Sequence, residues 1–447
     1  MDPITTAYVK IWGTVVGAVA WMQDRGYAAF EYEPSFFSKG WDLSPIHLSI
    51  REAQPGGSFS FPEIDPFTFY GLPGLLASSL PDDFGNSIID SWLRRNGRDP
   101  RSFNPVERLC YIGTRGMGAL EYSPQINPKR LSKSVSIEVE KLLELAQDVL
   151  TERANLDVHM KGSDKERAEA MLDILRVGVS AGGAVPKAVV AINDDGHVIS
   201  GQSTLPDGYD HWILKFDGVS QGTANKFGHS LEDCRVEYAY SLMAKSAGIK
   251  MKECGLLHEN RRAHFMTKRF DRNHNDRIHV LSLACMGHFG WNPAGSVGYE
   301  DAFQVMRLLN LPYLDHDQQY RRMIFNALTR NVDDHVKNIS YTMDKEGIWK
   351  LSPAYDLTFS YNPGDLLGGR HKMTINGRQS DVTINDFQDV ANNMEINKSA
   401  EIIEEIVDVV AMWPEFARQA EVKPEVSEYI GSLHLNSNTL ASGISMR

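Results

Sequence analysis

The first part of the chain alternates apolar and polar residues over short runs, a pattern that predicts antiparallel strands. Residues 27–32 alternate in this way, and the short runs 8–12 and 14–21, which flank Gly13, are typical of the same small sheet. Asp83–Arg95 differs, because its apolar residues recur at helical spacing and form one stripe. Residues 113–118 are rich in glycine and predict a loop. The pattern therefore predicts a β-rich N-terminal subdomain with short helices.

In the middle of the chain, the pattern of apolar residues predicts helices first and strands afterwards. Apolar residues recur at helical spacing over 136–150 and again over 164–175. Short apolar runs that favour strands follow at 188–192, 197–200, 211–216 and 262–269. Before the last of these strands, an amphipathic segment over 231–247 ends at Gly248, which predicts a helix with a glycine stop.

The last third of the chain is mainly helical in its pattern. Helices are predicted over 300–309, 316–329 and 400–412, and a short hairpin over 339–343 and 348–351. A β-rich lobe followed by a helical lobe is the order of a protein kinase. We therefore predict an α+β, protein-kinase-like bilobal fold with an extra N-terminal β-rich subdomain and a mainly helical C-terminal lobe. The predicted domains are 1–125, 126–270 and 271–447.

Composition restricts the class of protein and its cellular location but does not indicate a function. The chain has 447 residues and a formal net charge of −12, which argues against an intrinsic nucleic-acid or anionic-membrane surface. Four cysteines are scattered along it without a metal-site or disulfide pattern. No run approaches the roughly 18 apolar residues of a membrane span, and no secretory leader is evident. We expect a cytoplasmic protein with no membrane partner.

The segment Asn331–Ser340 and the later Asp356 predict a phosphoryl-transfer site. Asp333 and Asn338 are five positions apart, the offset at which a kinase places its base and a metal ligand, and Asp334 lacks that offset. Asp333 would take the proton of the acceptor hydroxyl, while Asn338 and Asp356 would hold Mg²⁺ through hard oxygen ligands. Taken alone, the same residues also fit a surface loop whose side chains cap turns.

A loop of small residues precedes the predicted strand 188–192. It reads Ser180-Ala181-Gly182-Gly183-Ala184-Val185-Pro186-Lys187, and small residues let backbone N–H groups approach phosphate oxygens. The loop matches neither of the common glycine-rich phosphate motifs, so its pattern alone also fits a flexible connector. Beside the other motifs we interpret it as a phosphate loop.

Lys215 lies in the apolar run 211–216, where a cation needs a partner. We predict that it binds nucleotide phosphates and pairs with Glu237 on the amphipathic helix 231–247. A lysine that extends to solvent from a strand end is the alternative. The segment Lys268-Arg269-Phe270-Asp271-Arg272 lies between the two lobes, and we predict a hinge there with Phe270 against an adenine ring.

Taken in order, six elements resemble the HipA family. They are the Ser-x-x-Gly-Ala-x-x-Lys loop, the strand lysine, the helix Glu-Tyr, Arg-Phe-Asp-Arg, Asp-Asp-His-x-Lys-Asn and Pro-x-Tyr-Asp. HipA proteins are serine/threonine kinase toxins of bacterial toxin–antitoxin modules. The resemblance extends from about residue 8 to beyond residue 410. In the best-known pattern of the family a glycine follows the base, whereas this chain has Asp334.

The resemblance implies ATP and Mg²⁺ as cofactors and assigns residue roles. Asp333 would be the base, Asn338 and Asp356 the metal ligands, and Ser180 a site of inhibitory autophosphorylation. The implied nucleotide-binding residues are Ala181–Lys187, Lys215, Arg269, Phe270 and Tyr355. The implied partners are a HipB-like helix-turn-helix antitoxin, operator DNA reached mainly through that antitoxin, and a protein substrate such as an aminoacyl-tRNA synthetase.

Two other functions fit the same residues. A small-molecule or lipid kinase shares the Asp-x-x-x-x-Asn and downstream Asp arrangement. A catalytically silent protein that only bridges antitoxin and DNA is the second alternative, and the complete set of Lys215, Asp333, Asn338 and Asp356 speaks against it.

Overall fold

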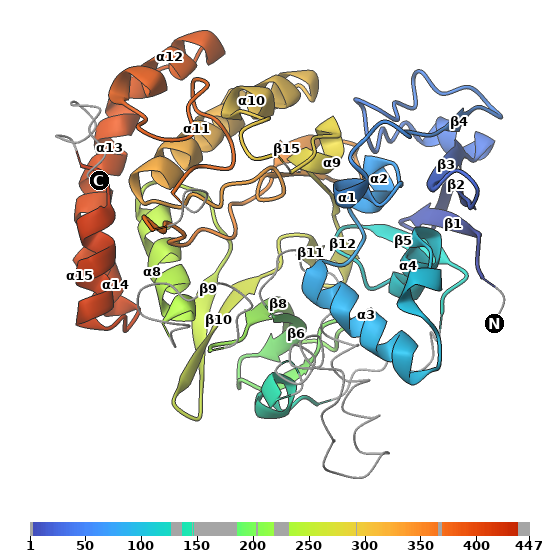
Figure 1. Cartoon of the computed structure of the whole chain (residues 1–447), viewed down its shortest axis with the longest axis horizontal. Coiled ribbons are helices and arrows are strands. Elements are labelled where there is room, and N and C mark those ends of the chain that lie inside the picture. The colour runs from blue at the N-terminus through green and yellow to red at the C-terminus, as the bar shows by residue number, and fades with distance from the viewer. Residues whose placement is uncertain are drawn as a thin grey trace.

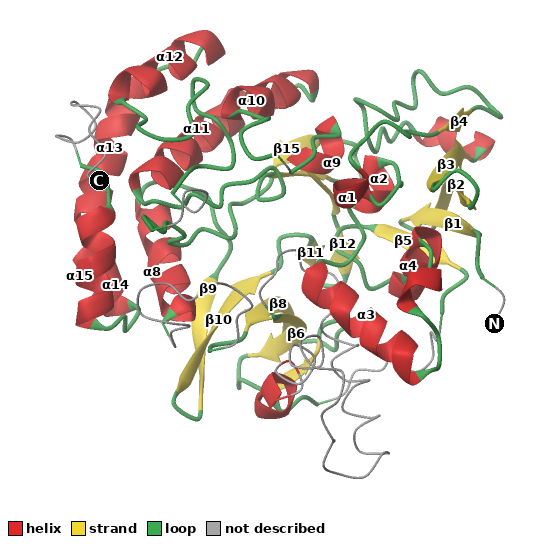
Figure 2. Cartoon of the chain, viewed as in Figure 1, coloured by secondary structure: helices red, strands yellow, loops and turns green. Residues whose placement is uncertain are grey.

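The computed structural model describes residues 3–126, 136–144, 146, 186–202, 204–218, 232–291, 293–364 and 369–436. Figure 1 shows the N-terminal sheet on one side of the molecule and the C-terminal helices on the other. The second sheet lies between them, toward one end. Figure 2 shows the C-terminal helices gathered on one side, and strands interspersed with the N-terminal helices over the rest of the molecule.

The N-terminal subdomain is built on an antiparallel sheet with the strand order β4-β3-β2-β1-β5. Its strands are β1 (Thr6–Ile11), β2 (Thr14–Met22), β3 (Tyr27–Tyr32), β4 (Ser58–Phe59) and β5 (Leu120–Ser123). β1 and β2 form a hairpin in which Ile11 pairs with Thr14. The turn residues Trp12 and Gly13 have φ of 47° and 78°, the positive values that a tight two-residue hairpin turn requires.

Six helices accompany this sheet in the described part of the N-terminal subdomain. They are η1 (Pro34–Lys39), α1 (Pro66–Phe69), α2 (Gly74–Ala77), α3 (Asp83–Arg95), η2 (Pro100–Ser102) and α4 (Pro105–Ile112). Of these, η1 and α4 contact the strands of the sheet. Asp82 caps α3 by accepting a hydrogen bond from the Gly85 N–H, and Asn104 and Glu107 form a capping box on α4. α3 has the bounds that its apolar stripe predicts.

The second sheet has the order β7-β6-β8-β10-β9 and is antiparallel throughout. Its strands are β6 (Lys187–Asn193), β7 (Val198–Ser200), β8 (Tyr209–Lys215), β9 (Cys254–Glu259) and β10 (Arg262–Lys268). α8 (Asp233–Ser246) lies between β8 and β9 in sequence and packs against β10. The small pair β11 (Arg272–Asn273) and β12 (Asp276–Arg277) follows.

The C-terminal lobe is mainly helical. Its helices are α9 (Leu283–Gly287), α10 (Tyr299–Leu308), α11 (Tyr313–Leu328), α12 (Ile384–Met394), α13 (Ser399–Ala411), α14 (Trp413–Gln419) and α15 (Pro424–Leu433). A small sheet with the order β13-β14-β15 lies within it. These strands are β13 (His279–Ser282), β14 (Ser340–Met343) and β15 (Trp349–Leu351).

The two larger apolar cores among the described residues hold these parts together. The larger core joins the N-terminal sheet to α8 and to the C-terminal helices. In the second core, the α3 residues Phe84 and Ile88 pack with Val190 of β6 and Leu214 of β8. The N-terminal subdomain therefore contacts both lobes. Among the described residues, no helix combines the length and apolar character that a membrane span needs.

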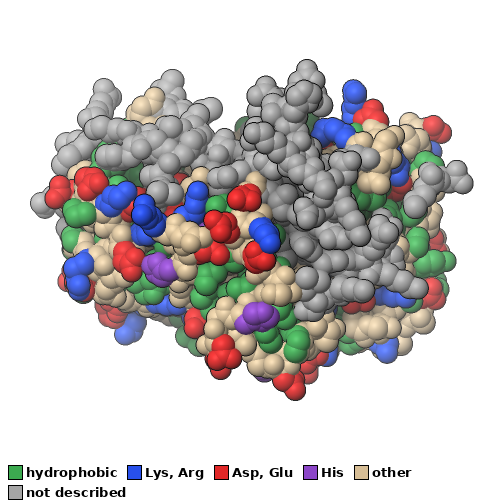
Figure 3. Space-filling view, turned by 90° about the horizontal axis from the view of Figure 1, so that it is seen from below, with side chains coloured by type: hydrophobic (Ala, Val, Ile, Leu, Met, Phe, Trp, Pro, Cys, Tyr) green, Lys and Arg blue, Asp and Glu red, His purple; other side chains and the backbone are tan. Residues whose placement is uncertain are grey.

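The predicted fold class is confirmed, since a β-rich N-terminal subdomain, a mixed lobe and a helical lobe follow one another. The hairpin β14–β15 and helices α10, α11 and α13 lie where the pattern predicts them. Helical residues 139–144 belong to the predicted helix 136–150, and the predicted helix 164–175 lies outside the described residues. The domain boundaries stay a prediction. On the face seen in Figure 3, acidic and basic side chains are interspersed over the described residues.

Candidate active site

Lys215 is the centre of a buried cluster of charged side chains. Its Nζ donates hydrogen bonds to the two carboxylate oxygens of Glu237 on α8, at 2.6 and 2.8 Å. It also forms an ion pair with Asp356, which follows β15. Glu237 and Asp356 lie 22 and 141 positions from Lys215 in the chain. The structure therefore brings three of the predicted site residues into direct contact.

One ammonium group in this cluster faces two carboxylates. Burial disfavours the charged form of Lys215, but Asp356 and Glu237 outweigh it and raise the pKa of Lys215. Burial alone would raise the pKa of Asp356, yet Lys215 and Lys187 hold that pKa well below its usual range. For Glu237, burial raises the pKa and Lys215 offsets this only in part. Asp356 is thus held ionised, the form that binds a cation.

Lys187 is a second buried lysine beside the cluster. It lies directly opposite Lys215 in the pairing of β6 with β8. Residues paired in this way point to the same face of a sheet, so both ammonium groups leave it on one side. Lys187 Nζ lies 3.7 Å from Oδ2 of Asp82, at the start of α3. Sequence reasoning missed Asp82, because an aspartate before a helix indicates only an N-cap.

The loop between α11 and β14 carries Asp333 and Asn338. Asn338 Nδ2 donates to the Asp333 carbonyl oxygen at 2.9 Å, and the Asn338 N–H donates to the His335 carbonyl oxygen at 2.8 Å. The Asp333 N–H donates to Ser360 Oγ at 2.9 Å. These bonds fix the loop and use the amide nitrogen of Asn338. Its amide oxygen, Oδ1, is the atom that can bind a cation.

Asp333 and Asp334 differ in exposure and in their hydrogen bonds. Asp333 is exposed, whereas Asp334 is 3% exposed and its side chain is turned into the lobe. Asp334 accepts hydrogen bonds from the Tyr299 hydroxyl at 2.9 Å and the Lys372 N–H at 2.8 Å, and contacts His371 Nδ1 at 2.8 Å. Asp334 is therefore engaged in the interior, and sequence reasoning did not find this structural role.

The surroundings of Asp333 favour its protonated form. Although the side chain reaches solvent, the protein around it partly buries the carboxylate and raises its pKa. His335 opposes the shift, and the like charge of Asp356 adds to it. A carboxylate with a raised pKa is a stronger base than an ordinary aspartate, which suits removal of a proton from a hydroxyl.

Asn338, Tyr355 and Asp356 line one hollow of the surface. Asp356 has a backbone φ of +59°, a left-handed conformation that is unusual for a residue other than glycine. Such conformations gather at functional sites, where the surrounding structure imposes them. An ionised carboxylate and an amide oxygen in one hollow fit the oxygen ligands that Mg²⁺ prefers. These two residues could therefore hold part of a magnesium site.

Phe270, in the segment predicted as a hinge, and Tyr355 lie close together. Their ring centroids are 5.5 Å apart and the rings are tilted by 30°. Tyr355 donates a hydrogen bond from its hydroxyl to the Lys337 carbonyl oxygen at 2.7 Å and contacts Ser340 Oγ at 2.6 Å. The loop that carries Asn338 is thus connected to the residue that precedes Asp356. The predicted place of both rings beside a nucleotide base stays a prediction.

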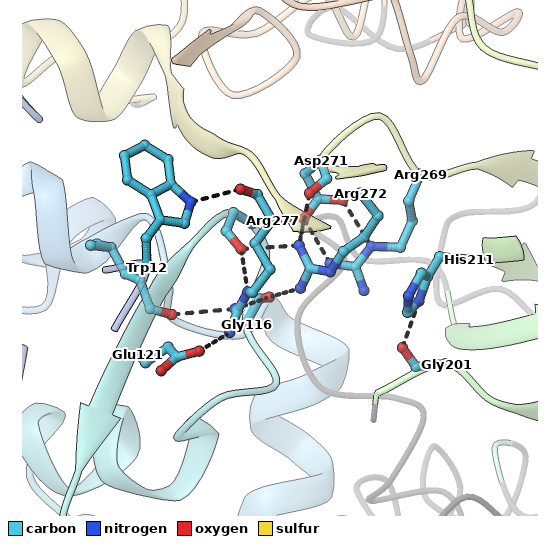
Figure 4. A network of polar contacts seen from close by, with 11 residues as sticks. Trp12, Gly116, Glu121, Gly201, His211, Arg269, Asp271, Arg272 and Arg277 are labelled. Atoms are coloured by element: carbon cyan, nitrogen blue, oxygen red, sulfur yellow. Dashed lines mark hydrogen bonds and ion pairs between the residues drawn. The ribbon is translucent and has the colours of Figure 1, made fainter. Parts of the chain in front are cut away.

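Arg269 is directed into a buried polar network, which Figure 4 shows. Its Nε and Nη2 donate to the two carboxylate oxygens of Asp271 at 2.8 and 2.7 Å. Asp271 also accepts hydrogen bonds from Arg272 Nη1 and from the Gly118 N–H of the N-terminal subdomain, each at 2.7 Å. The described contacts of Arg269 thus connect the hinge to the N-terminal subdomain, and its role beside adenine stays a prediction.

The remaining predicted residues of the phosphate loop begin β6 or lie beyond the described ranges. The Pro186 carbonyl oxygen accepts a hydrogen bond from the Phe216 N–H at 3.3 Å, which fixes the start of β6 against the end of β8. Ser180 and residues 181–185 lie outside the described residues.

Two family models match most of the chain. Residues 7–123 match the HipA N-terminal domain, and residues 179–413 match the HipA-like C-terminal domain. No curated protein sequence matches this chain. The second match alone covers more than half of the 447 residues.

Two solved structures resemble this chain to different degrees. A chain from the complex of the Shewanella oneidensis MR-1 toxin–antitoxin proteins HipA and HipB with operator DNA is 15% identical, with a TM-score of 0.62. That alignment covers 98% of this chain and 96% of the other, so the two share a fold. The Helicobacter pylori proinflammatory kinase CtkA is 11% identical over 56% of this chain and 92% of the other. Its TM-score of 0.32 is too low to support a shared fold.

Proposed function

We propose, because this chain belongs to the HipA family, that it is an ATP- and Mg²⁺-dependent protein serine/threonine kinase and the toxin of a bacterial toxin–antitoxin module. The contact of Lys215 with Glu237 and Asp356 carries the proposal. Phosphoryl transfer needs a cation for the phosphates, oxygen ligands for a metal and a carboxylate at the acceptor. The described residues offer groups of each kind close to one another.

The lysines on the second sheet would bind the nucleotide phosphates. Lys215 and Lys187 leave the sheet on one face, and Glu237 fixes the Lys215 ammonium group. Positioning of this kind contributes to catalysis by holding the reacting groups in register. The loop 181–187 would add backbone N–H groups, and Phe270, Tyr355 and Arg269 would border the base.

Asn338 and Asp356 would hold Mg²⁺. When bound, the ion would neutralise charge on the phosphates during transfer. The contribution of the protein is to keep Asp356 ionised through Lys215 and Lys187, and to direct the Asn338 oxygen outward by fixing its nitrogen.

Asp333 would orient the acceptor hydroxyl and take its proton. The carboxylate is exposed, so a substrate chain can reach it, and its raised pKa strengthens it as a base. The hydrogen bonds of the Asp333 backbone to Ser360 and Asn338 would hold the carboxylate in a constant place.

Ser180 would be a site of inhibitory autophosphorylation. A phosphate there would add about −1.5 to −2 charge to a loop that faces the phosphates of ATP, and like charges would repel. We expect Ser180→Ala to lower the phosphate incorporated into the chain itself and to keep activity toward other proteins. Unchanged stoichiometry of incorporation at Ser180→Ala would contradict this assignment, and mass spectrometry would measure it.

The family and the solved complex support the proposed antitoxin and DNA partners, and the substrate is proposed from the family alone. The Shewanella chain was solved with HipB and operator DNA, which supports a HipB-like antitoxin and DNA contact mainly through it. The net charge of −12 and the mixed charges seen in Figure 3 suit that indirect contact. The substrate would be a protein of translation, such as an aminoacyl-tRNA synthetase.

Transfer from labelled ATP tests this proposal against its alternatives. The purified chain would be incubated with γ-labelled ATP and Mg²⁺, once with a cell lysate and once with the metabolite pool of the same cells. We expect label in protein serine or threonine. Label only in metabolites would indicate a small-molecule kinase. If wild type and Asp333→Asn were equally inert toward ATP and equally harmless to growth, the chain would be a catalytically silent binding protein.

A further inference from the structure

The two lysines of the proposed nucleotide site face each other across neighbouring strands. Lys187 and Lys215 are directly paired between β6 and β8 and are 4% and 8% exposed. Like charges directly opposite on a sheet destabilise it, and burial makes each ammonium group costlier. Such a pair persists only when carboxylates lie nearby. Lys215 has Glu237 and Asp356, so the carboxylate beside Lys187 needs an explanation of its own.

That carboxylate belongs to Asp82 of the N-terminal subdomain. Asp82 Oδ2 lies 3.7 Å from Lys187 Nζ, and the two side chains are 5% and 4% exposed. Asp82 Oδ1 accepts the Gly85 N–H at 2.7 Å, so its carboxylate is fixed at the N-terminus of α3. Burial lowers the pKa of Lys187, and Asp82 is the largest influence that opposes this. Asp82 therefore favours the charged form of Lys187.

α3 is itself fixed against the strands that carry the lysines. Phe84 and Ile88 of α3 pack in one core with Ala188 and Val190 of β6 and with Leu214 of β8. Asp82, two residues before Phe84, therefore has a constant place relative to Lys187. Figure 1 shows α3 reaching from the N-terminal sheet toward β6 and β8.

From this geometry we infer that Asp82 is a positioning residue of the nucleotide site, which holds the Lys187 ammonium group where it meets phosphate. The N-terminal subdomain thereby contributes to nucleotide binding. The inference rests on the proposed function. The carboxylate of Asp82 also carries negative charge, but its Oδ1 is engaged by the partly positive N-terminus of α3. The N-terminus of α3 therefore offsets part of the repulsion between Asp82 and the nucleotide phosphates.

Asp82→Asn is the variant that separates charge from helix capping. Asparagine caps helices as well as aspartate does, so α3 keeps its cap while the carboxylate is lost. We expect the full-length variant to bind a fluorescent ADP analogue with Mg²⁺ roughly tenfold more weakly, the effect of one lost interaction with a charged group. Its affinity for adenosine, which has no phosphate, should equal that of wild type. A merely structural defect would weaken both.

Two further variants complete the experiment. Asp65→Asn is the matched control, because Asp65 caps α1 of the same subdomain through the N–H groups of Phe67 and Thr68. It should bind the ADP analogue like wild type. In a Lys187→Met background, Asp82→Asn should have no additional effect, because both changes act on one interaction.

Three results would overturn the inference. They are unchanged or tighter binding of the ADP analogue by Asp82→Asn, an equal loss of adenosine affinity, and additive effects of the two changes in the double variant. If wild type binds the analogue and one of these results is found, only this inference fails. If wild type binds no nucleotide, the proposed function fails together with it.

Discussion

Asp333 and Asp334 adjoin in the sequence but have different surroundings. Asp333 is exposed, whereas Asp334 is bound inside the lobe by Tyr299, His371 and Lys372. Asp334 also lines the hollow of Asn338 and Asp356. The offset of five residues to Asn338 favours Asp333 as the base. The exposure of Asp333 and the three contacts that engage the Asp334 carboxylate support the same choice. Asp334, the residue that departs from the best-known family pattern, thus makes hydrogen bonds in the interior of the lobe.

Paired variants of these two residues should separate activity from stability. Asp333→Asn should lower kcat for phosphoryl transfer roughly 10²- to 10⁴-fold, the usual contribution of a general base. It should not lower the free energy of unfolding, because the surroundings of Asp333 disfavour its charged form. Asp334→Asn should lower the free energy of unfolding by about 1–3 kcal/mol. The reason is that the new amide N–H groups would face the hydrogen-bond donors that now bind the Asp334 carboxylate. Transfer kinetics and urea unfolding measure the two effects. Wild-type kcat in Asp333→Asn would contradict the assignment of the base.

α3 and α8 are the helices that bring carboxylates to the second sheet. α8 supplies Glu237 to Lys215, and α3 begins after Asp82, beside Lys187. α3 is held by apolar packing, with Ile88 fully buried between the N-terminal subdomain and the strands β6 and β8. The stability of this contact therefore depends on the apolar stripe that the sequence shows.

Truncation of that stripe should loosen the contact. Ile88→Ala should lower the free energy of unfolding by about 2–5 kcal/mol, because it removes buried methyl groups and leaves a cavity. Ile348→Ala is the matched control, since Ile348 is 52% exposed and its loss should cost less than about 0.5 kcal/mol. Chemical denaturation measures both. Equal effects of the two substitutions would contradict the packing of α3.

Elements with strong periodicity could be predicted, and contacts between distant elements could not. The stripe of α3 and the alternation of β3 depend on neighbouring residues, so their bounds agree with the pattern. β13 was missed because a strand of four residues is defined by its pairing with β14, far along the chain. The contact of Asp82 with Lys187 was missed for the same reason. The pair of Lys215 and Glu237 could be predicted from the sequence, because Lys215 lies in a predicted strand and Glu237 lies in the helix that follows it.

At the scale of the whole molecule, the network around Asp271 connects the predicted hinge segment to the N-terminal subdomain. Arg269 and Arg272 bind this carboxylate from the hinge, and Gly118 donates its N–H from the N-terminal subdomain. Arg277 reaches the same subdomain through Glu121 at 2.9 Å. Burial would raise the pKa of Asp271, but Arg269 and Arg272 hold it well below its usual range. The connection of the N-terminal subdomain to the lobes is therefore electrostatic as well as apolar.

This network gives stability a defined pH dependence. Because the pKa of Asp271 is depressed in the folded state, its contribution is present above the unfolded pKa of about 3.9 and is lost as pH falls below it. Asp271→Asn should be less stable than wild type near neutral pH by about 3–5 kcal/mol. The difference should narrow below about pH 4 in urea unfolding. A difference that stays constant on acidification would contradict the role of the carboxylate.

Calorimetric titration of ATP into the whole chain, with and without Mg²⁺, tests most directly whether the Lys215–Glu237–Asp356 cluster is a magnesium–nucleotide site. The account predicts that wild type binds ATP more tightly when Mg²⁺ is present, and that Asp356→Asn loses this dependence because one metal ligand is gone. Wild type that binds no ATP, or Asp356→Asn that retains the full effect of Mg²⁺, would contradict it.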